Sequence, residues 1–393
     1  MARFLWVQKQ DVGPQLRFGQ AMAFDAARGR VVLFGGSTGS SFLGDTWEWD
    51  GAHWTEVADT GPDARSGHAM AFDAARGRIV LFGGISEGAF LNDTWEWDGT
   101  DWTQVADTGP SSRAGHAMAF DSGRGVTVLF GGNGSAGLLS DTWEWNGTDW
   151  AQTEDVGPPA RQGHTMAFDP GAARTLLFGG AGTNGAGLGD TWSWNGTSWT
   201  QLQDIGPGAC VGGAIVFASS AAILFGGVNT IDTTVPVASH HLNNNTWQLQ
   251  GERWTQVQDM GPEPRWRHSM AFNTQDAHIV LFGGLSLFAP DGDPSLATGL
   301  LGDTWEHDAG VALALVEVFK AGTGSGTVIS SPAGINCGGS CAASFPRGTV
   351  VTLTAIPAAG STFTGWSGGG CTGTGSCTVT VDVATTVAAN FTL

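Results

Sequence analysis

A sequence repeat recurs through the first 310 residues, and one copy of it contains RIVLFGG (78–84), DTWEWDGTDWTQVADTGP (93–110) and RAGHAMAF (113–120). It contains short alternating runs, a double glycine and a Gly-Pro turn. The double glycines are spaced 48, 48, 48, 47 and 57 residues apart, at Gly35-Gly36, Gly83-Gly84, Gly131-Gly132, Gly179-Gly180, Gly226-Gly227 and Gly283-Gly284. A period near 50 made only of short strands predicts a β-propeller with one four-stranded sheet per repeat.

Five repeats also pair an Asp-Thr-Trp element, which is Asn-Thr-Trp at Trp247, with a second tryptophan seven residues on. The pairs are Trp47/Trp54, Trp95/Trp102, Trp143/Trp150, Trp192/Trp199 and Trp247/Trp254. Together with the double glycine, this pattern resembles the kelch repeat over residues 1 to about 310, with tryptophan in place of the usual kelch tyrosine. The resemblance implies four strands per blade: RxGHAMAFD innermost, then RIVLFGG, DTWEWDG and WTQVAD. The large rings are expected to bury roughly 200 Å² each between neighbouring blades.

The two ends of the repeat region complement each other. Trp6 lies 48 residues before Trp54, so the chain begins with the last strand of a repeat. Asp303-Thr304-Trp305 opens a third strand, but Ala312 stands where the second tryptophan is due. The simplest solution is that the Trp6 strand completes the last blade, which removes exposed sheet edges. The sequence therefore predicts an all-β, six-bladed propeller over residues 1–311.

Residues 312–393 have a different pattern, with SPAGINCGGSC, FPRGTVVTLTAIPAAGSTFTGW and SCTVTVDVATTVAANFTL. They resemble the divergent internalin-type B repeat, a small β-rich module of bacterial surface and secreted proteins. Four of the five cysteines lie here. Local pairs, Cys337 with Cys341 and Cys371 with Cys377, are the natural prediction, although four cysteines allow three connectivities. Disulfides are typical of an oxidising compartment, so a secreted or cell-surface protein is expected. Cys210 is left over and is expected to be a buried, inert thiol.

Composition restricts the partners. The net charge is −19, with 13% charged residues, so the basic face required to bind nucleic acid is not expected. No apolar run is long enough to span a membrane, and residues 1–10 lack the apolar core of a signal peptide. The chain contains no tyrosine, which excludes the copper and tyrosine–cysteine chemistry of galactose-oxidase-like kelch proteins.

Residues that recur in most blades are interpreted as scaffold. These are an arginine and a histidine before the first strand and an aspartate before the third: Arg17, Arg65, Arg113, Arg161 and Arg265; His68, His116, His164 and His268; Asp45, Asp93, Asp141, Asp190 and Asp303. Blade-to-blade hydrogen bonds and Arg–Asp pairs explain them better than a ring of ligands. The repeated Glu48, Glu96 and Glu144 are interpreted as solvated strand positions rather than glycosidase carboxylates.

Function is sought where the repeat is broken. Blade five has Cys210, Gly213 and Asn245 in place of arginine, histidine and aspartate, and a longer loop at 228–244; blade six has another at 285–302. The two loops should lie side by side on one face. The candidate ligand-binding residues are Asp232, His240, His241, Arg253, Trp266, Arg267, Asp291, Asp293 and His307. Asp291-Gly292-Asp293 could hold Ca²⁺, and His240-His241 a transition metal, but a turn and a solvated loop explain them equally well.

The preferred interpretation is a non-catalytic binding or adhesion protein that recognises a glycan or protein through these loops. No nucleophile elbow or phosphate loop is present. The alternatives are a carbohydrate-active enzyme on the kelch propeller, either sialic-acid-epimerase-like or a hydrolase, a lectin with one site per blade, and a purely structural surface component. No oligomeric state is indicated.

Overall fold

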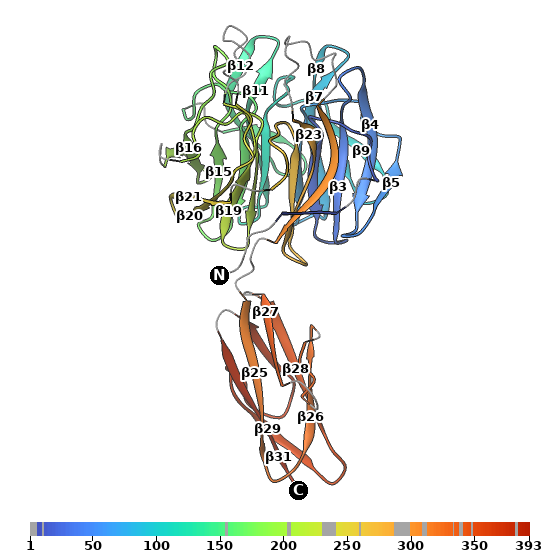
Figure 1. The fold of residues 1–393 in the computed structure, drawn as a ribbon, viewed down its shortest axis with the longest axis vertical. Coiled ribbons are helices and arrows are strands. Elements are labelled where there is room, and N and C mark those ends of the chain that lie inside the picture. The colour runs from blue at the N-terminus through green and yellow to red at the C-terminus, as the bar shows by residue number, and fades with distance from the viewer. Residues whose placement is uncertain are drawn as a thin grey trace. The chain divides into compact units, whose positions relative to one another are not determined.

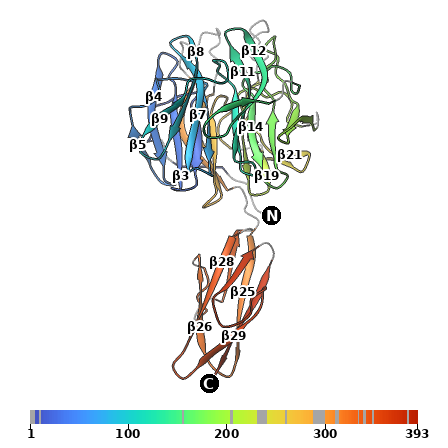
Figure 2. The same ribbon diagram turned by 180° about the vertical axis from the view of Figure 1, so that it is seen from behind.

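The computed structural model describes residues 6–9, 12–153, 156–202, 206–229, 241–258, 261–286, 299–308, 313–332, 334–337, 341–346, 349–381 and 384–393. The regular elements in these ranges are β-strands, and none of these ranges contains a helix able to cross a membrane. Contacts divide the chain into two compact units, Met1–Ala309 and Gly310–Leu393 (Figures 1 and 2).

The first unit contains six four-stranded antiparallel sheets, each of which is one blade. Strands are given from the innermost outward. Blade one is β2 (Ala21–Asp25), β3 (Arg30–Ser37), β4 (Phe42–Trp49) and β5 (Trp54–Ala58). Blade two is β6 (Ala69–Asp73), β7 (Arg78–Ser86), β8 (Ala89–Trp97) and β9 (Trp102–Ala106). Blade three is β10 (Ala117–Asp121), β11 (Val126–Gly134), β12 (Gly137–Trp145) and β13 (Trp150–Gln152). Blade four is β14 (Thr165–Asp169), β15 (Arg174–Phe178), β16 (Thr191–Trp194) and β17 (Trp199–Gln201). Blade five is β18 (Ala214–Ala218), β19 (Ala221–Phe225), β20 (Thr246–Gln250) and β21 (Arg253–Gln258). Blade six is β22 (Ser269–Asn273), β23 (His278–Leu285), β24 (Leu300–Asp308) and β1 (Trp6–Gln8).

The first strand of each blade lies at the centre, because β2, β6, β10, β14, β18 and β22 each contact the same strand in both neighbouring blades. The described connections between second and third strands lie at one end of the propeller, as the β7–β8 and β11–β12 hairpins show in Figure 1. The segment leading into each first strand begins at that same end, which we call the loop face. The predicted order of strands within a blade is confirmed.

The N-terminal strand closes the ring. β1 pairs antiparallel with β24, with Trp6 opposite His307, so the sixth sheet combines the first and last strands of the propeller. The Trp6 indole donates a 3.0 Å hydrogen bond to Thr246 Oγ1 in blade five. Every other outer-strand tryptophan donates the same bond to the Asp-Thr-Trp threonine of the preceding blade: Trp54 to Thr304, Trp102 to Thr46, Trp150 to Thr94, Trp199 to Thr142 and Trp254 to Thr191. The predicted count of six blades and their closure are confirmed.

Apolar side chains fill the spaces between blades rather than the interior of one blade. Phe34 of blade one packs with Met70, Leu81 and Trp97 of blade two. Trp102 of blade two lies edge-on to Phe34, with ring centroids 5.2 Å apart. Fully burying one tryptophan is worth about 5 kcal/mol before conformational entropy is subtracted. A single blade could not bury both of its faces, so the blades stabilise one another.

The double glycines meet a backbone requirement. Gly83 and Gly84 have φ of 62° and 105°, a region that L side chains rarely adopt. A Cβ on Gly83 would lie 2.8 Å from the Arg113 carbonyl oxygen, and one on Gly84 3.0 Å from that of Ser66. Gly84 N–H donates a 2.9 Å hydrogen bond to the Arg113 carbonyl in the next blade. Glycine therefore allows the second strand of one blade to approach the backbone of its neighbour.

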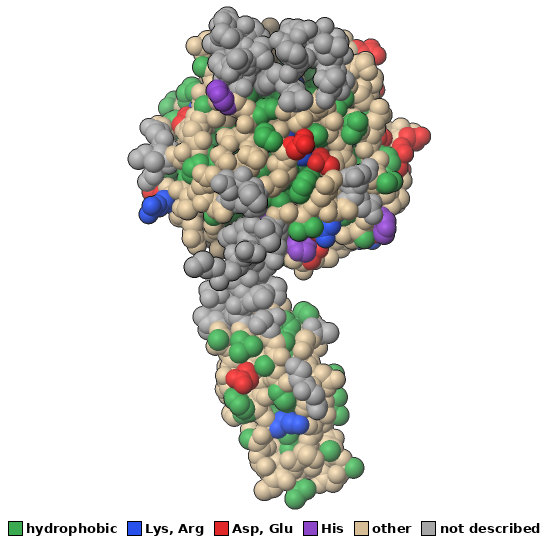
Figure 3. Space-filling model, in the orientation of Figure 1, with side chains coloured by type: hydrophobic (Ala, Val, Ile, Leu, Met, Phe, Trp, Pro, Cys, Tyr) green, Lys and Arg blue, Asp and Glu red, His purple; other side chains and the backbone are tan. Residues whose placement is uncertain are grey.

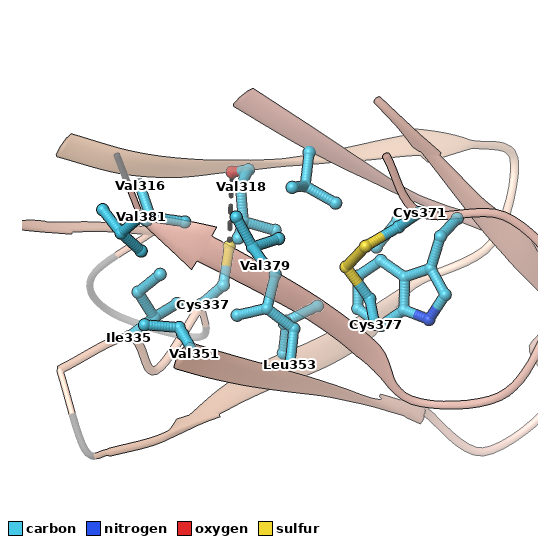
Figure 4. Close-up of a cluster of buried hydrophobic side chains, with 14 of the residues drawn as sticks. Val316, Val318, Ile335, Cys337, Val351, Leu353, Cys371, Cys377, Val379 and Val381 are labelled. Carbon is cyan, nitrogen blue, oxygen red and sulfur yellow. Dashed lines mark hydrogen bonds between the residues drawn. A yellow bond between two sulfur atoms is a disulfide. The ribbon is translucent and has the colours of Figure 1, made fainter. Parts of the chain in front are cut away.

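The second unit is a small two-sheet β-module. Its sheets have the orders β27-β25-β31-β29 and β26-β28-β30. The strands are β25 (Leu313–Gly322), β26 (Gly326–Ser331), β27 (Ala342–Pro346), β28 (Thr349–Pro357), β29 (Thr362–Gly368), β30 (Cys377–Val381) and β31 (Thr385–Thr392). Valine, leucine and cysteine side chains from both sheets form its core (Figure 4). Cys337 is bonded to Cys341 and Cys371 to Cys377, which confirms the predicted local pairs.

Closure by β1 gives a direct test. Replacing Trp6 with alanine removes a buried ring and leaves the Thr246 hydroxyl without its donor, so we expect the free energy of unfolding of the propeller to fall by about 3–5 kcal/mol. Val7→Ala is the matched control, because Val7 lies on the same strand and is 53% exposed. Denaturant melts followed by tryptophan fluorescence measure both. Equal melts for W6A and V7A would contradict a structural role for this strand.

Candidate functional site

The recurring arginines and aspartates form ion pairs within five of the six blades. Arg65 is fully buried, and its guanidinium grips Asp93 through two hydrogen bonds of 2.6 and 2.7 Å. Arg65 also donates to the carbonyls of Gly83 and Asp63, at 2.9 Å each. Desolvation would raise the pKa of Asp93, but the hydrogen bonds and charge of Arg65, with Trp95, outweigh it and hold that pKa below its usual value. Equivalent pairs join Arg17 to Asp45, Arg113 to Asp141, Arg161 to Asp190 and Arg265 to Asp303.

Blade five replaces both partners of this pair at once. Cys210 takes the arginine position, and its thiol donates to the Gly226 carbonyl at 3.4 Å. Asn245 takes the aspartate position, so neither partner leaves a buried charge behind. Burial raises the pKa of the Cys210 thiol to about 12, which keeps it protonated and unreactive. The expectation of a buried, inert thiol is confirmed.

The repeated glutamates are also ion-paired, at the opposite end of the blades. Glu48 accepts a 2.5 Å hydrogen bond from Arg28, which also binds Asp25 at 2.7 Å. Arg76 and Arg124 make the same contacts with Glu96 and Glu144. The expectation of solvated strand positions was wrong, because these carboxylates are largely covered and neutralise arginines. Their partners explain why they recur and leave them as scaffold.

A closed circle of backbone hydrogen bonds surrounds the central channel at the loop face. One residue from each blade donates its N–H to the carbonyl of the residue in the preceding blade, at 2.7–2.9 Å. The circle runs through Gly19, Gly67, Gly115, Gly163, Gly212 and Arg267, and Gly19 donates to Arg267 to complete it. All six have positive φ, between 54° and 67°. We call this set the mouth ring.

Arg267 is the single non-glycine residue of the mouth ring. Its φ of 54° costs about 1–2 kcal/mol relative to glycine. Its guanidinium carbon lies 4.4 Å from the ring centroid of Trp266 and 5.8 Å from that of Phe18. The Arg267 side chain is exposed at the mouth, and partial desolvation by the protein atoms packed around it lowers its pKa. An arginine nevertheless stays protonated at neutral pH.

The mouth ring encloses a cavity of about 370 Å³. Its lining combines the ring with the residues on either side of it and with loop-face residues of blades two and three. The polar lining side chains outside the ring are Gln20, Ser66, His68, His116, Asn133, Gln162, His164 and His268. Asn133 and Gln162 also line a second, more open depression on the same face. Among the described residues that line the first cavity, none is an aspartate or glutamate.

The four lining histidines are buried and uncharged. Each is 5–6% exposed, and burial, reinforced by the charge of the neighbouring arginine, lowers the pKa of His68, His164 and His268 to about 3. The pKa of His116 is also far below its ordinary value, with burial as the main cause. His164 Nε2 lies 3.1 Å from the Phe130 carbonyl of the preceding blade. Gln20 takes this position in blade one and donates to the Phe282 carbonyl at 2.8 Å. Each of the four histidine rings also lies against a phenylalanine of the preceding blade, with ring centroids 5.5–5.6 Å apart, so the histidines link blades through ring contacts.

Among the candidates from sequence, Trp266 and Arg267 come together at the cavity. Trp266 is 8% exposed and packs with Ala181, Val211 and Val228 in a small apolar cluster of blades four to six. His241 is exposed on the loop face, and its N–H donates to Asn229 Oδ1 at 2.8 Å. It precedes Leu242, which packs against the cluster that contains Trp266.

Other candidates do not join this group. Arg253 is exposed at the start of β21, the outermost strand of blade five, next to the turn at the end opposite the loop face. His307 is fully buried in β24 and packs at a tilt against Trp6, with ring centroids 4.8 Å apart. It fills a position that blades one to four give to a buried tryptophan, so its surroundings are those of a core residue.

Asp232, His240, Asp291 and Asp293 lie outside the described residues, and with them the suggested Ca²⁺ and histidine sites. Within the residues that are described, no three His, Cys, Asp or Glu side chains gather as a metal site. On the propeller face drawn in Figure 3, charged side chains occur in small groups on a mainly uncharged surface.

Sequence reasoning missed the neutral polar lining and the mouth ring. Gly19, Gly67, Gly115, Gly163 and Gly212 recur as plainly as the arginines, but their backbone role has no side-chain signature. The position before each of them does vary, with Phe18, Ser66, Ala114, Gln162, Val211 and Trp266. This variable position lies between the recurring arginine and the recurring glycine. Its variation was the available signal for a surface that differs from blade to blade.

The blades and their motifs define a kelch-type propeller followed by a β-rich module. Residues 4–154 match the family model of the KLHDC2/KLHL20/DRC7 kelch-repeats domain, and residues 319–393 match that of the divergent InlB B-repeat domain. The chain therefore carries kelch repeats and a divergent InlB B-repeat domain. Among solved structures it resembles "Structure of YjhT", with a TM-score of 0.59 and 15% identity, covering 74% of this chain and 95% of that one. At this identity the likeness concerns the fold. A comparison with curated protein sequences gave no match.

The paired replacement in blade five predicts how blade two will respond to mutation. Asp93→Asn alone leaves Arg65 buried beside an uncharged partner, and we expect it to lower the free energy of unfolding by about 3–5 kcal/mol. Adding Arg65→Cys reproduces the blade-five pair and should restore part of that loss, because the orphaned charge is gone. Denaturant melts of the two single variants and the double variant measure the coupling. Strictly additive losses would show that the two residues do not act as a pair.

The buried histidines predict loss of stability in mild acid. Because their folded-state pKa values lie below the unfolded value near 6.5, the stability they confer is complete above about pH 6.5 and declines as the pH falls toward 3. We expect about 1.4 kcal/mol of lost unfolding free energy per pH unit for each histidine. His116→Gln installs the residue that blade one has at Gln20. It should lower the pH dependence of the unfolding free energy by the contribution of one histidine, about 1.4 kcal/mol per pH unit. Urea melts at several pH values measure it, and parallel curves for H116Q and wild type would refute the assignment.

Proposed function

We propose that the propeller is a non-catalytic binding module of an exported or cell-surface protein, and that it recognises a glycan or protein at the mouth cavity. The observation that carries this proposal is the break in the mouth ring. Five blades contribute glycine, while blade six contributes Arg267 beside Trp266 at a cavity of about 370 Å³. Volumes of roughly 300–1,000 Å³ are usual for small-ligand sites, and aromatic and arginine side chains are frequent binding residues.

The chemistry of the lining supports binding over catalysis. A glycosidase needs two carboxylates near the scissile bond, and the described lining of this cavity has none. Histidines with a pKa of about 3 offer no proton to a substrate at neutral pH. The carboxylates of Glu48, Glu96 and Glu144 are bound to arginines at the other end of the blades. A carbohydrate-active enzyme is the alternative, and pH-dependent turnover of a glycan substrate would identify it.

Export is supported by the second unit. Its two disulfides are of the kind that persists in oxidising compartments, and its sequence matches the divergent InlB B-repeat domain. We infer that this module is a surface or spacer element, while the propeller carries the ligand.

A glycan array, run with and without calcium, tests the proposal. The wild-type chain should bind a subset of glycans. The double variant Trp266→Ser/Arg267→Gly, which installs the Ser66-Gly67 pair of blade two, should lose this binding while keeping its cooperative melt. Titration of an array hit should give one ligand per chain, because the site is unique to blade six. A stoichiometry near six would instead indicate a lectin with one site per blade. Full binding by the double variant would place the site elsewhere.

A further inference from the structure

The guanidinium of Arg267 differs from the other arginines near the channel. Those that recur before each first strand are fully buried and held by two hydrogen bonds to an aspartate. Within the described residues, Arg267 makes no ion pair and no side-chain hydrogen bond, and its contacts are the faces of Trp266 and Phe18. Stacking on rings fixes the plane of a guanidinium and leaves its N–H donors available. Arg267 is therefore held against the Trp266 ring at the mouth, and no other side chain in the described part of the chain takes up its N–H donors.

The backbone at this position favours glycine, so the arginine needs a reason. The other five residues of the mouth ring are glycines with φ of 63–67°, and Arg267 adopts φ of 54° in the same hydrogen-bonded circle. Strained positions retained against a better-suited residue are concentrated at ligand sites. Since glycine would complete the ring equally well, the ring itself does not account for Arg267.

The surroundings suit an anion that carries hydroxyl groups. The described lining contains no carboxylate that could compete for Arg267. Gln20, Ser66, Asn133 and Gln162 line the same cavity with neutral polar side chains from four different blades. Gln20 Nε2 is bound to the Phe282 carbonyl, so Gln20 adds its Oε1 as an acceptor. Amides and hydroxyls of this kind match sugar hydroxyls. A cavity of about 370 Å³ accepts one sugar ring rather than a folded partner.

We propose that the mouth cavity binds a sugar acid and that Arg267 is the residue that recognises its carboxylate through two parallel N–H donors. The lining amides and hydroxyls hold the sugar hydroxyls, and Trp266 supplies the apolar wall. This inference rests on the proposed binding function and narrows its ligand class.

The test uses the full chain and two charged–neutral pairs in isothermal titration: glucuronate with glucose, and galacturonate with galactose. Within at least one pair, we expect the wild type to bind the acid about tenfold or more tightly than the neutral sugar. The acid gains hydrogen bonds from Arg267 to its charged carboxylate, and the neutral sugar has no such group. Raising the ionic strength should weaken binding of the acid alone.

Arg267→Gly is a variant with a built-in folding control. Because glycine is the residue that the mouth ring uses in the other five blades, R267G should melt at the wild-type temperature or above it. It should lose the preference for the acid. Arg267→Lys should retain part of it, since lysine keeps the charge but not the fork. Arg253→Gln, which removes an exposed arginine at the opposite end of blade five, should leave the preference unchanged.

The outcomes separate the two proposals. Equal affinity for acid and neutral sugar in the wild type, or an undiminished preference in R267G, would overturn the sugar-acid assignment while leaving the binding function intact. Binding to neutral glycans on the array without binding of either acid would do the same. Failure of the wild type to bind any glycan on the array would overturn both the sugar-acid assignment and glycan recognition by the propeller.

Discussion

The propeller depends on pairing between the two ends of its own chain. β1 supplies the outer strand of a blade whose other strands lie beyond residue 268, and Trp6 continues the series of tryptophan–threonine bonds between blades. Without that strand, β24 would be an open edge and blade five would lose the ring that covers its threonine. The mouth ring closes by the same logic, because its sixth hydrogen bond joins Gly19 to Arg267 across the seam. All six blades must be in register before either circle is complete.

The sequence was sufficient for the architecture because every repeat carries its own strand and turn pattern. Blade count and closure followed from the spacing of the double glycines and tryptophans. The strand order within a blade came from the resemblance to kelch repeats, and the local disulfide pairs were the natural prediction among three possible connectivities. The energetics were less visible. Glu48 was predicted to be a solvated strand residue, because its neighbours in the sequence do not indicate the ion pair that it forms with Arg28, twenty positions earlier. A contact made by a long side chain leaves no periodic signal.

The site was only partly predictable, for a related reason. Comparing repeats singled out Trp266 and Arg267, and the structure places both at one cavity. The same comparison also proposed Arg253 and His307, because it detects departures from the repeat without locating them along the blade. His307 departs from the pattern inside the core, where it packs against Trp6. Whether an unusual residue faces a cavity or a neighbouring ring is decided by packing, which the spacing of repeats does not encode.

A ring of similar blades imposes its own condition on recognition. Groups repeated around the axis present equivalent contacts in several orientations, so they cannot fix a single pose for one asymmetric ligand. The histidines and arginines near the channel are such groups: the arginines are ion-paired within their blades, and the histidine rings pack on phenylalanines of the preceding blades. Orientation must therefore come from residues that occur once. Arg267 meets this condition in the strictest way, since it replaces a recurring glycine in the mouth ring while preserving that glycine's backbone hydrogen bonds. The ring of backbone hydrogen bonds therefore stays closed, and the Arg267 side chain makes one position around the channel mouth different from the other five.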